Sequence, residues 1–250
     1  MRAFVAITKL TLRQLLGGKR LLGLGLLALV PTAIMWLASA NLTGGAVVNR
    51  FHDAPLGVVF LIVVPVVSLI LGSAPLGDDR RDGTLSFLML RPLPRSLIVA
   101  AKLFAAWLAS TLVVGTAGAL AASVVGLRVG DWSYVGPTIV AIAIACLGYV
   151  SVFLLLGYFT ARAVLIGLVY VFIWENGISL AAASLANVSL LRVGLSAYVG
   201  MVPEAENYGL DREILGAVTP GAGGAAAKAF VVAVIVILFA ARMLRRRDLT

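Results

Sequence analysis

Six long apolar stretches, separated by short polar segments, dominate the chain. A hydrocarbon core about 30 Å thick needs roughly 20 helical residues to cross, because a helix rises about 1.5 Å per residue. We therefore predict six transmembrane helices, at residues 21–40, 56–76, 97–125, 135–159, 164–183 and 225–244. Pro31 and Pro65 lie within the first two, and since each removes a backbone hydrogen bond, local kinks are expected there.

Residues 1–20 have the pattern of an amphipathic helix that lies in the membrane interface. Four cations fall on one face of such a helix because they are separated by seven, four and seven residues; they are Arg2, Lys9, Arg13 and Arg20. Phe4, Ile7, Leu12 and Leu15 fill the remainder, so the apolar side is expected to face the lipid. A signal peptide is the alternative, since Lys19 and Arg20 precede an apolar run that ends in Ala38-Ser39-Ala40.

The composition supports a polytopic membrane protein. Hydrophobic residues make up 61% of the chain, charged residues 12%, and the mean hydropathy is +1.06, which is outside the range of soluble domains. The net charge of +9 comes from basic residues in a few loops, so it indicates orientation and no nucleic-acid partner. A single Cys146 and a single His52 exclude a disulfide framework and a His/Cys metal site within one chain.

The distribution of basic residues predicts the topology. With six crossings, the segments 2–20, 80–102 and 242–247 and Arg162 all fall on one side. The other side carries basic residues that are diluted by nearby acids, namely Arg50, Arg128, Arg192, Arg212 and Lys228. Because basic loops stay in the cytoplasm, both termini are predicted to be cytoplasmic.

Two stripes of small residues in the third predicted span indicate close helix packing. One consists of Ala101, Ala105 and Ala109, and the other of Gly118, Ala122 and Gly126.

The densest polar chemistry lies in residues 77–96, between the second and third predicted spans. It begins with Asp78, Asp79, Arg80, Arg81 and Asp82. Asp82, Gly83 and Thr84 are expected to start a short helix, on which Leu85, Leu88 and Met89 form an apolar edge. Arg91, Pro92 and Arg95 follow, and Lys102 is expected to reach back from the next span to the membrane surface. Such a segment suits docking to another protein, the alternative being a surface helix on the bilayer.

Glu175 is the one acidic residue that lies within a predicted span. It lies about 12 residues, or roughly 18 Å, beyond the start of the fifth span, just past the midplane. An intramembrane carboxyl is expected to face protein or water and to have a partner. The alternative is that the helix breaks at Asn176-Gly177 and leaves Glu175 near the outer interface as a hydrogen-bonded structural group.

The remaining extramembrane segment, 184–224, is predicted to form an extracytoplasmic cap. Its first half is apolar and is expected to be a helix packed on, or dipping into, the outer face of the membrane, and its second half is expected to be irregular. The sequence has no phosphate-binding G-x-x-x-x-G-K-[ST] motif, no H-E-x-x-H and no G-x-S-x-G. The chain is therefore predicted not to be an enzyme and not to bind ATP itself.

The charged segment resembles the cytoplasmic loop of the type-2 ABC exporter permeases. The resemblance rests on an acidic cluster, Gly-Thr-Leu, Arg-Pro-x-x-Arg and a following lysine, which here are Asp78, Asp79, Asp82, Gly83, Thr84, Leu85, Arg91, Pro92, Arg95 and Lys102. It extends to the Trp174-Glu175 pair and to the Arg-rich tail that ends in Asp248-Leu249. The loop departs from the usual pattern at Asp79, where Glu is common, and at Pro94, which replaces a small polar residue.

The resemblance implies an all-α membrane protein with the type-2 ABC exporter permease fold, formed by residues 1–250 as a single transmembrane domain. It further implies a coupling helix in the loop, two copies of a cytosolic ABC ATPase that carry MgATP, no cofactor on this chain, and a second permease subunit. The expected location is a bacterial cytoplasmic membrane, and the expected cargo is amphipathic, lipid-like or drug-like. Two alternatives stay open: a proton-coupled secondary transporter that uses Glu175, and a non-transporting sensor or scaffold coupled to an ATPase.

Overall fold

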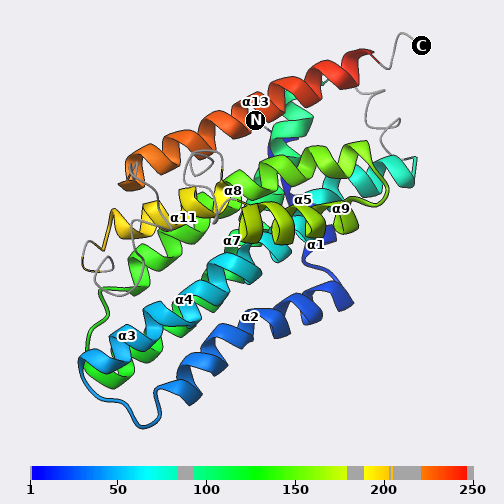
Figure 1. Cartoon of the computed structure of the whole chain (residues 1–250). Coiled ribbons are helices and arrows are strands. Elements are labelled where there is room, and N and C mark those ends of the chain that lie inside the picture. The colour runs from blue at the N-terminus through cyan, green and yellow to red at the C-terminus, as the bar shows by residue number, and fades with distance from the viewer. Residues whose placement is uncertain (1, 84–92, 179–188, 203, 205–220, 247–250) are drawn as a thin grey trace.

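The structure, a computed structural model, describes residues 2–83, 93–178, 189–202, 204 and 221–246. Within these ranges the secondary structure is helical, and the long helices run side by side (Figure 1). The first half contains α1 (Arg2–Leu15), α2 (Lys19–Ala38), α3 (Gly45–Asp53), α4 (Pro55–Val58), the π-helical η1 (Val59–Val63) and α5 (Val64–Arg81). The second half contains α7 (Arg95–Val129), α8 (Val135–Phe159), α9 (Ala163–Val169), the π-helical η2 (Tyr170–Ile178), α11 (Leu190–Val199) and α13 (Gly221–Arg246).

Four helical stretches in the described part of the chain are long and apolar enough to cross a membrane: Gly45–Arg81, Arg95–Val129, Val135–Phe159 and Gly221–Leu244. They correspond to the second, third, fourth and sixth predicted spans. The first and fifth predicted spans correspond to shorter apolar helices, Leu22–Ala38 and Ala163–Glu175. The protein is thus a multi-pass membrane protein, and the total of six crossings stays a prediction.

The two prolines in the predicted spans differ in their effect. Pro65 is the second residue of α5, which begins where the π-helical turn η1 ends, so the distortion expected there takes the form of a local change in helical hydrogen bonding. Helix α2 continues through Pro31 to Ala38.

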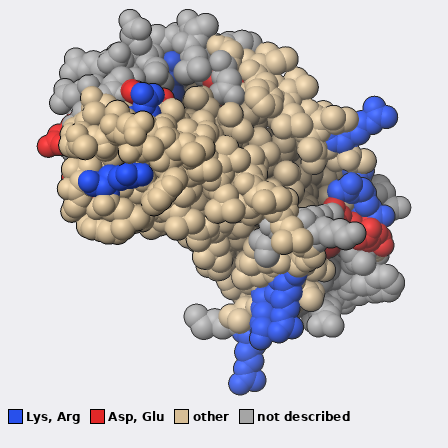
Figure 2. Space-filling view, turned by 90° about the horizontal axis from the view of Figure 1, so that it is seen from below, with Lys and Arg blue, Asp and Glu red and all other residues tan. Residues whose placement is uncertain are grey.

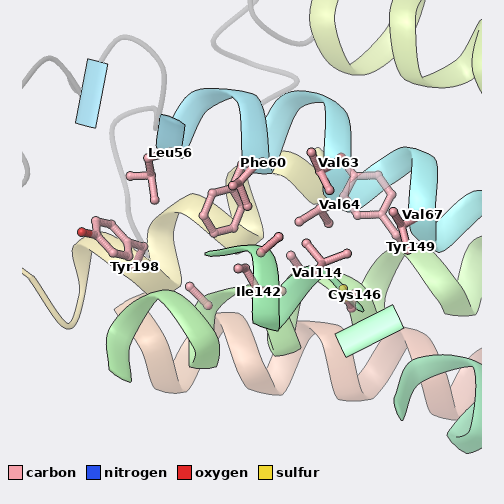
Figure 3. Close-up of a cluster of buried hydrophobic side chains, with 14 of the residues drawn as sticks. Leu56, Phe60, Val63, Val64, Val67, Val114, Ile142, Cys146, Tyr149 and Tyr198 are labelled. Atoms are coloured by element: carbon pink, nitrogen blue, oxygen red, sulfur yellow. The ribbon is translucent and has the colours of Figure 1, made fainter. Parts of the chain in front are cut away.

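Small residues bring α5, α7 and α8 close together, as the sequence predicted for α7. Ala101, Ala105 and Ala109 are fully buried, and a Cβ atom on Gly118 would lie 2.3 Å from the Ile142 Cδ1 of α8. The large core side chains between α4, η1, α5, α7, α8 and α11 include Phe60, Ile142, Tyr149 and Tyr198 (Figure 3). Helix α8 lies at the centre of this core, because it packs against α5, α7, α11 and α13.

Helix α1 is shorter than the predicted interfacial helix. It ends at Leu15, and the chain turns at Gly18, whose φ of 75° suits glycine. Arg20 therefore belongs to α2, and its predicted place on the cationic face of the first helix is wrong. Arg2, Lys9 and Arg13 are exposed, whereas Thr8, Thr11 and Leu15 are buried; α1 packs on α7, and the Thr8 hydroxyl donates to the carbonyl oxygen of Ala101 over 3.4 Å.

Charged side chains lie toward the margins of the face shown in Figure 2, and a broad region without them lies between. Large apolar side chains such as Leu26, Phe230 and Leu238 are exposed in the described part of the chain. A belt of this kind is expected where the solvent is hydrocarbon. We call the end that carries residues 78–83 and Arg95 the loop end of the bundle, and the opposite end, with Trp132, the far end.

Candidate functional site

The acidic cluster of the predicted loop forms the last turn of α5. Asp78, Asp79, Arg80 and Arg81 are helical, Asp82 is the C-terminal cap, and Gly83 has a left-handed φ of 68°. A left-handed glycine directly after a helix commonly ends it, and basic residues in the last turn are favoured by the helix dipole. Asp82 and Gly83 therefore end α5, and the new helix predicted to start at residues 82–84 would lie outside the described residues.

Part of the predicted docking segment lies outside the described residues, namely Thr84, Leu85, Leu88, Arg91 and Pro92. The described chain resumes before α7, which begins at Arg95 after an extended Pro94.

Lys102 of α7 is buried, with 3% of its surface exposed. Its ammonium donates to the Asp79 carboxylate of α5 and to the carbonyl oxygen of Pro75, 2.6 Å away. Lys102 thus does not reach back to the membrane surface as expected. It instead ties the two helices that flank residues 82–94 to each other.

Two arginines tie the same helices to the ends of α8 and α13. Arg80 donates to the carbonyl oxygens of Tyr158 and Phe159, the latter at 3.2 Å, and its guanidinium lies over the Tyr158 ring, 5.6 Å from the centroid. Arg95 donates to the carbonyl oxygen of Leu244 over 2.7 Å. Carbonyl groups in the last turn of a helix lack a helical partner, so both arginines act as C-terminal caps.

Arg81 makes only local contacts by comparison. It donates to Asp78 Oδ1 over 2.5 Å and to the carbonyl oxygen of Gly77 over 3.3 Å, and the pair with Asp78 is partly exposed. An exposed pair within one helix contributes little stability. The Arg81 side chain is 55% exposed, so its guanidinium is available at the surface.

Glu175 lies in a second polar cluster, inside the bundle. It is 1% exposed and lies in η2, which continues through Asn176 and Gly177 to Ile178. The break at Asn176-Gly177 that the alternative assumed is therefore not observed, whereas the hydrogen-bonded Glu175 that it also assumed is. The Tyr170 hydroxyl donates to Glu175 Oε1 over 2.9 Å, and the Ser189 hydroxyl donates to Oε2 over 2.6 Å.

The Glu175 carboxyl also caps the first turn of α11. The backbone N–H groups of Leu190 and Leu191 donate to it over 2.9 and 3.4 Å, and Ser189 accepts from the N–H of Arg192 over 3.3 Å. All ten residues of α11 are buried, so water cannot satisfy these groups. The negative carboxyl also lies at the positive end of the helix dipole, and the buried Arg192 lies within electrostatic reach.

The other end of α11 is held by a buried histidine of α3. His52 Nδ1 lies 2.8 Å from the carbonyl oxygen of Val48, so it carries a proton that it donates. His52 Nε2 lies 3.1 Å from the hydroxyl of Tyr198, and the His52 ring meets the Tyr134 ring edge-on with 5.6 Å between centroids. Helix α11 is therefore fixed at both ends by buried polar contacts.

A family model described as "ABC-2 family transporter protein" matches residues 5–248, so it extends over every described helix from α1 to α13. The chain belongs to the ABC-2 transporter family. Comparison with curated proteins finds no match.

In this ABC-2 family protein, the structure brings some of the predicted residues together and separates others. Asp79, Arg80, Arg95 and Lys102 each make a contact between two helices at the loop end, and we call these four side chains the loop anchor. Glu175 belongs to a different cluster, and its neighbours come from η2 and the start of α11.

Several partners of these residues were missed by sequence reasoning. Tyr158, Tyr170 and Ser189 are uncharged, and the carbonyl oxygens of Pro75 and Leu244 belong to the backbone. Only Ser189 had a usable signal, because a serine directly before an apolar run is typical of a helix N-terminal cap.

Proposed function

We propose that this chain is the permease subunit of an ATP-driven exporter, and that a separate cytosolic ABC ATPase supplies the energy. Membership of the ABC-2 transporter family supports a role in transport. The observation that carries the coupling proposal is the loop anchor, since its four side chains connect the two ends of residues 82–94 to α5, α7, α8 and α13.

The geometry of the loop anchor suits the transmission of force. A displacement of the loop would pull on α5 through Arg81 and on α7 through Arg95, the residues at which these helices end and begin. Because Lys102 binds α5 to α7 and the arginines bind the ends of α8 and α13, these helices would tilt together as a rigid body. The exposed Arg81 would contact the ATPase, together with the docking residues predicted from the sequence, and MgATP would be hydrolysed on that subunit.

In this proposal the loop end faces the cytoplasm of a bacterium, the chain crosses the inner membrane six times, and two copies of the ATPase and a second permease subunit complete the transporter. The second permease subunit would be either another copy or a paralogue. The basic residues at the loop end support this orientation. The apolar surface and the absence of a large polar domain in the described part of the chain favour an amphipathic cargo.

The Glu175 contacts bear on the proton-coupled alternative. Tyr170, Ser189 and Leu190 all donate hydrogen bonds to the Glu175 carboxyl oxygens. A carboxylate has enough lone pairs to accept all of them. Two of the donors to this carboxyl, the N–H groups of Leu190 and Leu191, lie in the first turn of the buried α11, so we assign Glu175 a positioning role and not that of a proton carrier. A sensor or scaffold coupled to an ATPase would use the same loop anchor, and only a transport assay separates it from the exporter.

The test is the ATPase activity of the chain alone and of the complex. The full chain, purified alone, should not hydrolyse ATP, and an ABC ATPase purified with it should be stimulated. Leu85→Asp combined with Leu88→Asp should abolish stimulation or assembly while membrane insertion stays normal. ATP hydrolysis by the isolated chain, or normal stimulation in the double variant, would contradict the proposal.

The orientation has its own test. Reporters inserted near Asp82 and fused after Arg247 should report the cytoplasm, and a reporter near Tyr208 should report the outside. An outside result after Arg247 would mean an odd number of crossings.

A further inference from the structure

A groove of about 500 Å³ lies between α11 and α13. Its walls are apolar, and they include Leu190 and Val193 of α11 and Ala229 and Val232 of α13. Lys228 is the charged residue among the described residues that line the groove. The volume falls within the roughly 300–1,000 Å³ of small-molecule sites.

The α13 wall of the groove belongs to the most exposed of the long apolar stretches, whereas Leu190 and Val193 of the α11 wall are buried. Of the four long apolar stretches, the one formed by α13 is buried least, at 33% against 56–61% for the others. Phe230 and Val231, which flank the groove on α13, are exposed. Exposed apolar side chains of a candidate membrane span are expected to meet lipid, so a molecule that enters the groove over α13 would come from the lipid.

Lys228 is placed to hold an anionic headgroup. It lies seven residues, or roughly 10 Å, inside the far end of α13. Helical side chains lean toward the helix N-terminus, so the ammonium points back toward the far-end interface, where lipid phosphates lie. Lys228 is exposed and takes part in no ion pair within the described part of the chain, although an unpaired ammonium is costly at membrane depth.

The N-terminus of α11 is a weaker candidate for the headgroup than Lys228. Leu190 lines the groove, and its N–H group is already bound by the Glu175 carboxyl. The helix N-terminus, which would otherwise attract a phosphate, is thus capped by the Glu175 carboxyl. An amphiphile would therefore lie with its headgroup at Lys228 and its chain along the apolar walls.

We propose that the groove between α11 and α13 is a binding site for a phospholipid with an anionic headgroup. If the loop end faces the cytoplasm, as the proposed function has it, the lipid comes from the outer leaflet. Only this choice of leaflet rests on the proposed function. The binding of the lipid depends on the groove alone. The bound lipid would pack against α11, the helix whose two ends are held by Glu175 and His52.

The probes are phosphatidylglycerol and phosphatidylcholine with identical acyl chains, titrated onto the purified full chain and followed by native mass spectrometry. The native chain should bind one phosphatidylglycerol about tenfold more tightly than phosphatidylcholine, as a charge-assisted contact predicts. Lys228→Met should abolish this preference, and Lys228→Arg should keep it. Equal affinities in the native chain, or an unchanged preference in Lys228→Met, would overturn the proposal.

Two further variants distinguish binding in the groove from general attraction of anionic lipid to the basic surface. Arg128→Gln removes another exposed cation near the far end, where its guanidinium lies 5.1 Å from the centre of the Trp36 ring, and it should leave the preference intact. Ala227→Trp should fill the groove and weaken the binding of both lipids, although the charge of Lys228 remains. A matching loss of preference in Arg128→Gln would indicate bulk attraction and overturn the site.

Other occupants give distinct results. Competition by inorganic phosphate as strong as that by the lipid would indicate a free anion site. Cross-linking between two copies through Ala227→Cys would indicate a subunit interface; the native Cys146 is buried and does not interfere. Either result would overturn the lipid assignment.

Discussion

Asp79 of α5 and Lys102 of α7 form an ion pair inside the protein, 23 residues apart in the sequence. The side chain of Lys102 is 4% exposed and that of Asp79 is 18% exposed. The pair closes the segment between α5 and α7 into a loop whose two ends are held together. Any partner that binds this loop therefore acts on two helices at once.

Removal of one member of this pair should be far more damaging than removal of both. Asp79→Asn should lower the free energy of unfolding by about 3–5 kcal/mol, because it takes the opposite charge away from the buried Lys102 ammonium. Lys102→Met should cost less, because the Asp79 side chain is 18% exposed and water can reach it. Asp79→Leu combined with Lys102→Met should be much closer to the native chain. Thermal unfolding of the purified chain measures this, and additive losses would mean that the two charges do not interact.

Arg80 and Arg81 are neighbours in the sequence with different expected effects on stability. Arg80→Ala should destabilise the chain by about 1–3 kcal/mol, since it removes a charge-assisted cap from α8 and the contact with Tyr158. Arg81→Ala is the matched control and should change stability by less than about 0.5 kcal/mol, because its contacts are local and partly exposed. Equal melting temperatures of the two variants would refute the capping role.

Substitutions of Glu175 separate a positioning role from proton transfer. Glu175→Gln keeps an oxygen for Tyr170 and Leu190, so we expect ATP-dependent transport to persist with a modest loss of stability. Glu175→Leu leaves the N–H groups of Leu190 and Leu191 unpaired, at a cost of about 1–3 kcal/mol each, and should loosen α11. Transport assays and amide exchange in α11 measure these effects; loss of transport in Glu175→Gln with normal ATPase activity and assembly would revive the proton-coupled alternative.

The close approach of α5 and α8 should be sensitive to a single methyl group. A Cβ atom on Gly157 would lie 2.1 Å from the carbonyl oxygen of Ser73, so Gly157→Ala must push the two helices apart near Arg80. Gly23→Ala, at a helical position with open space around it, is the control and should be neutral or slightly stabilising. Gel filtration and thermal unfolding of the two variants test this. Equal stability of Gly157→Ala and Gly23→Ala would mean that α5 and α8 are not packed as closely as described.

The sequence by itself determined the class of the protein and most of its helices. The span predicted at 135–159 is observed as α8, Val135–Phe159, because long apolar runs bounded by polar residues have one stable form in lipid. The small-residue stripe at Ala101, Ala105 and Ala109 was predicted to be a packing surface, and it is buried. The charged segment was also sufficient to indicate the family, which the family model confirms.

Only the tertiary structure decided which polar groups meet. The lysine expected at the surface is buried against Asp79, and Asp82 caps the end of α5. The apolar segment after Ser189 lies inside the bundle, with its first turn capped by Glu175. The physical reason is the same in each case. Hydrophobic periodicity reports how each helix faces lipid or protein, but the partner of a buried charge is often a backbone group or a distant side chain, and these become neighbours only when the helices pack.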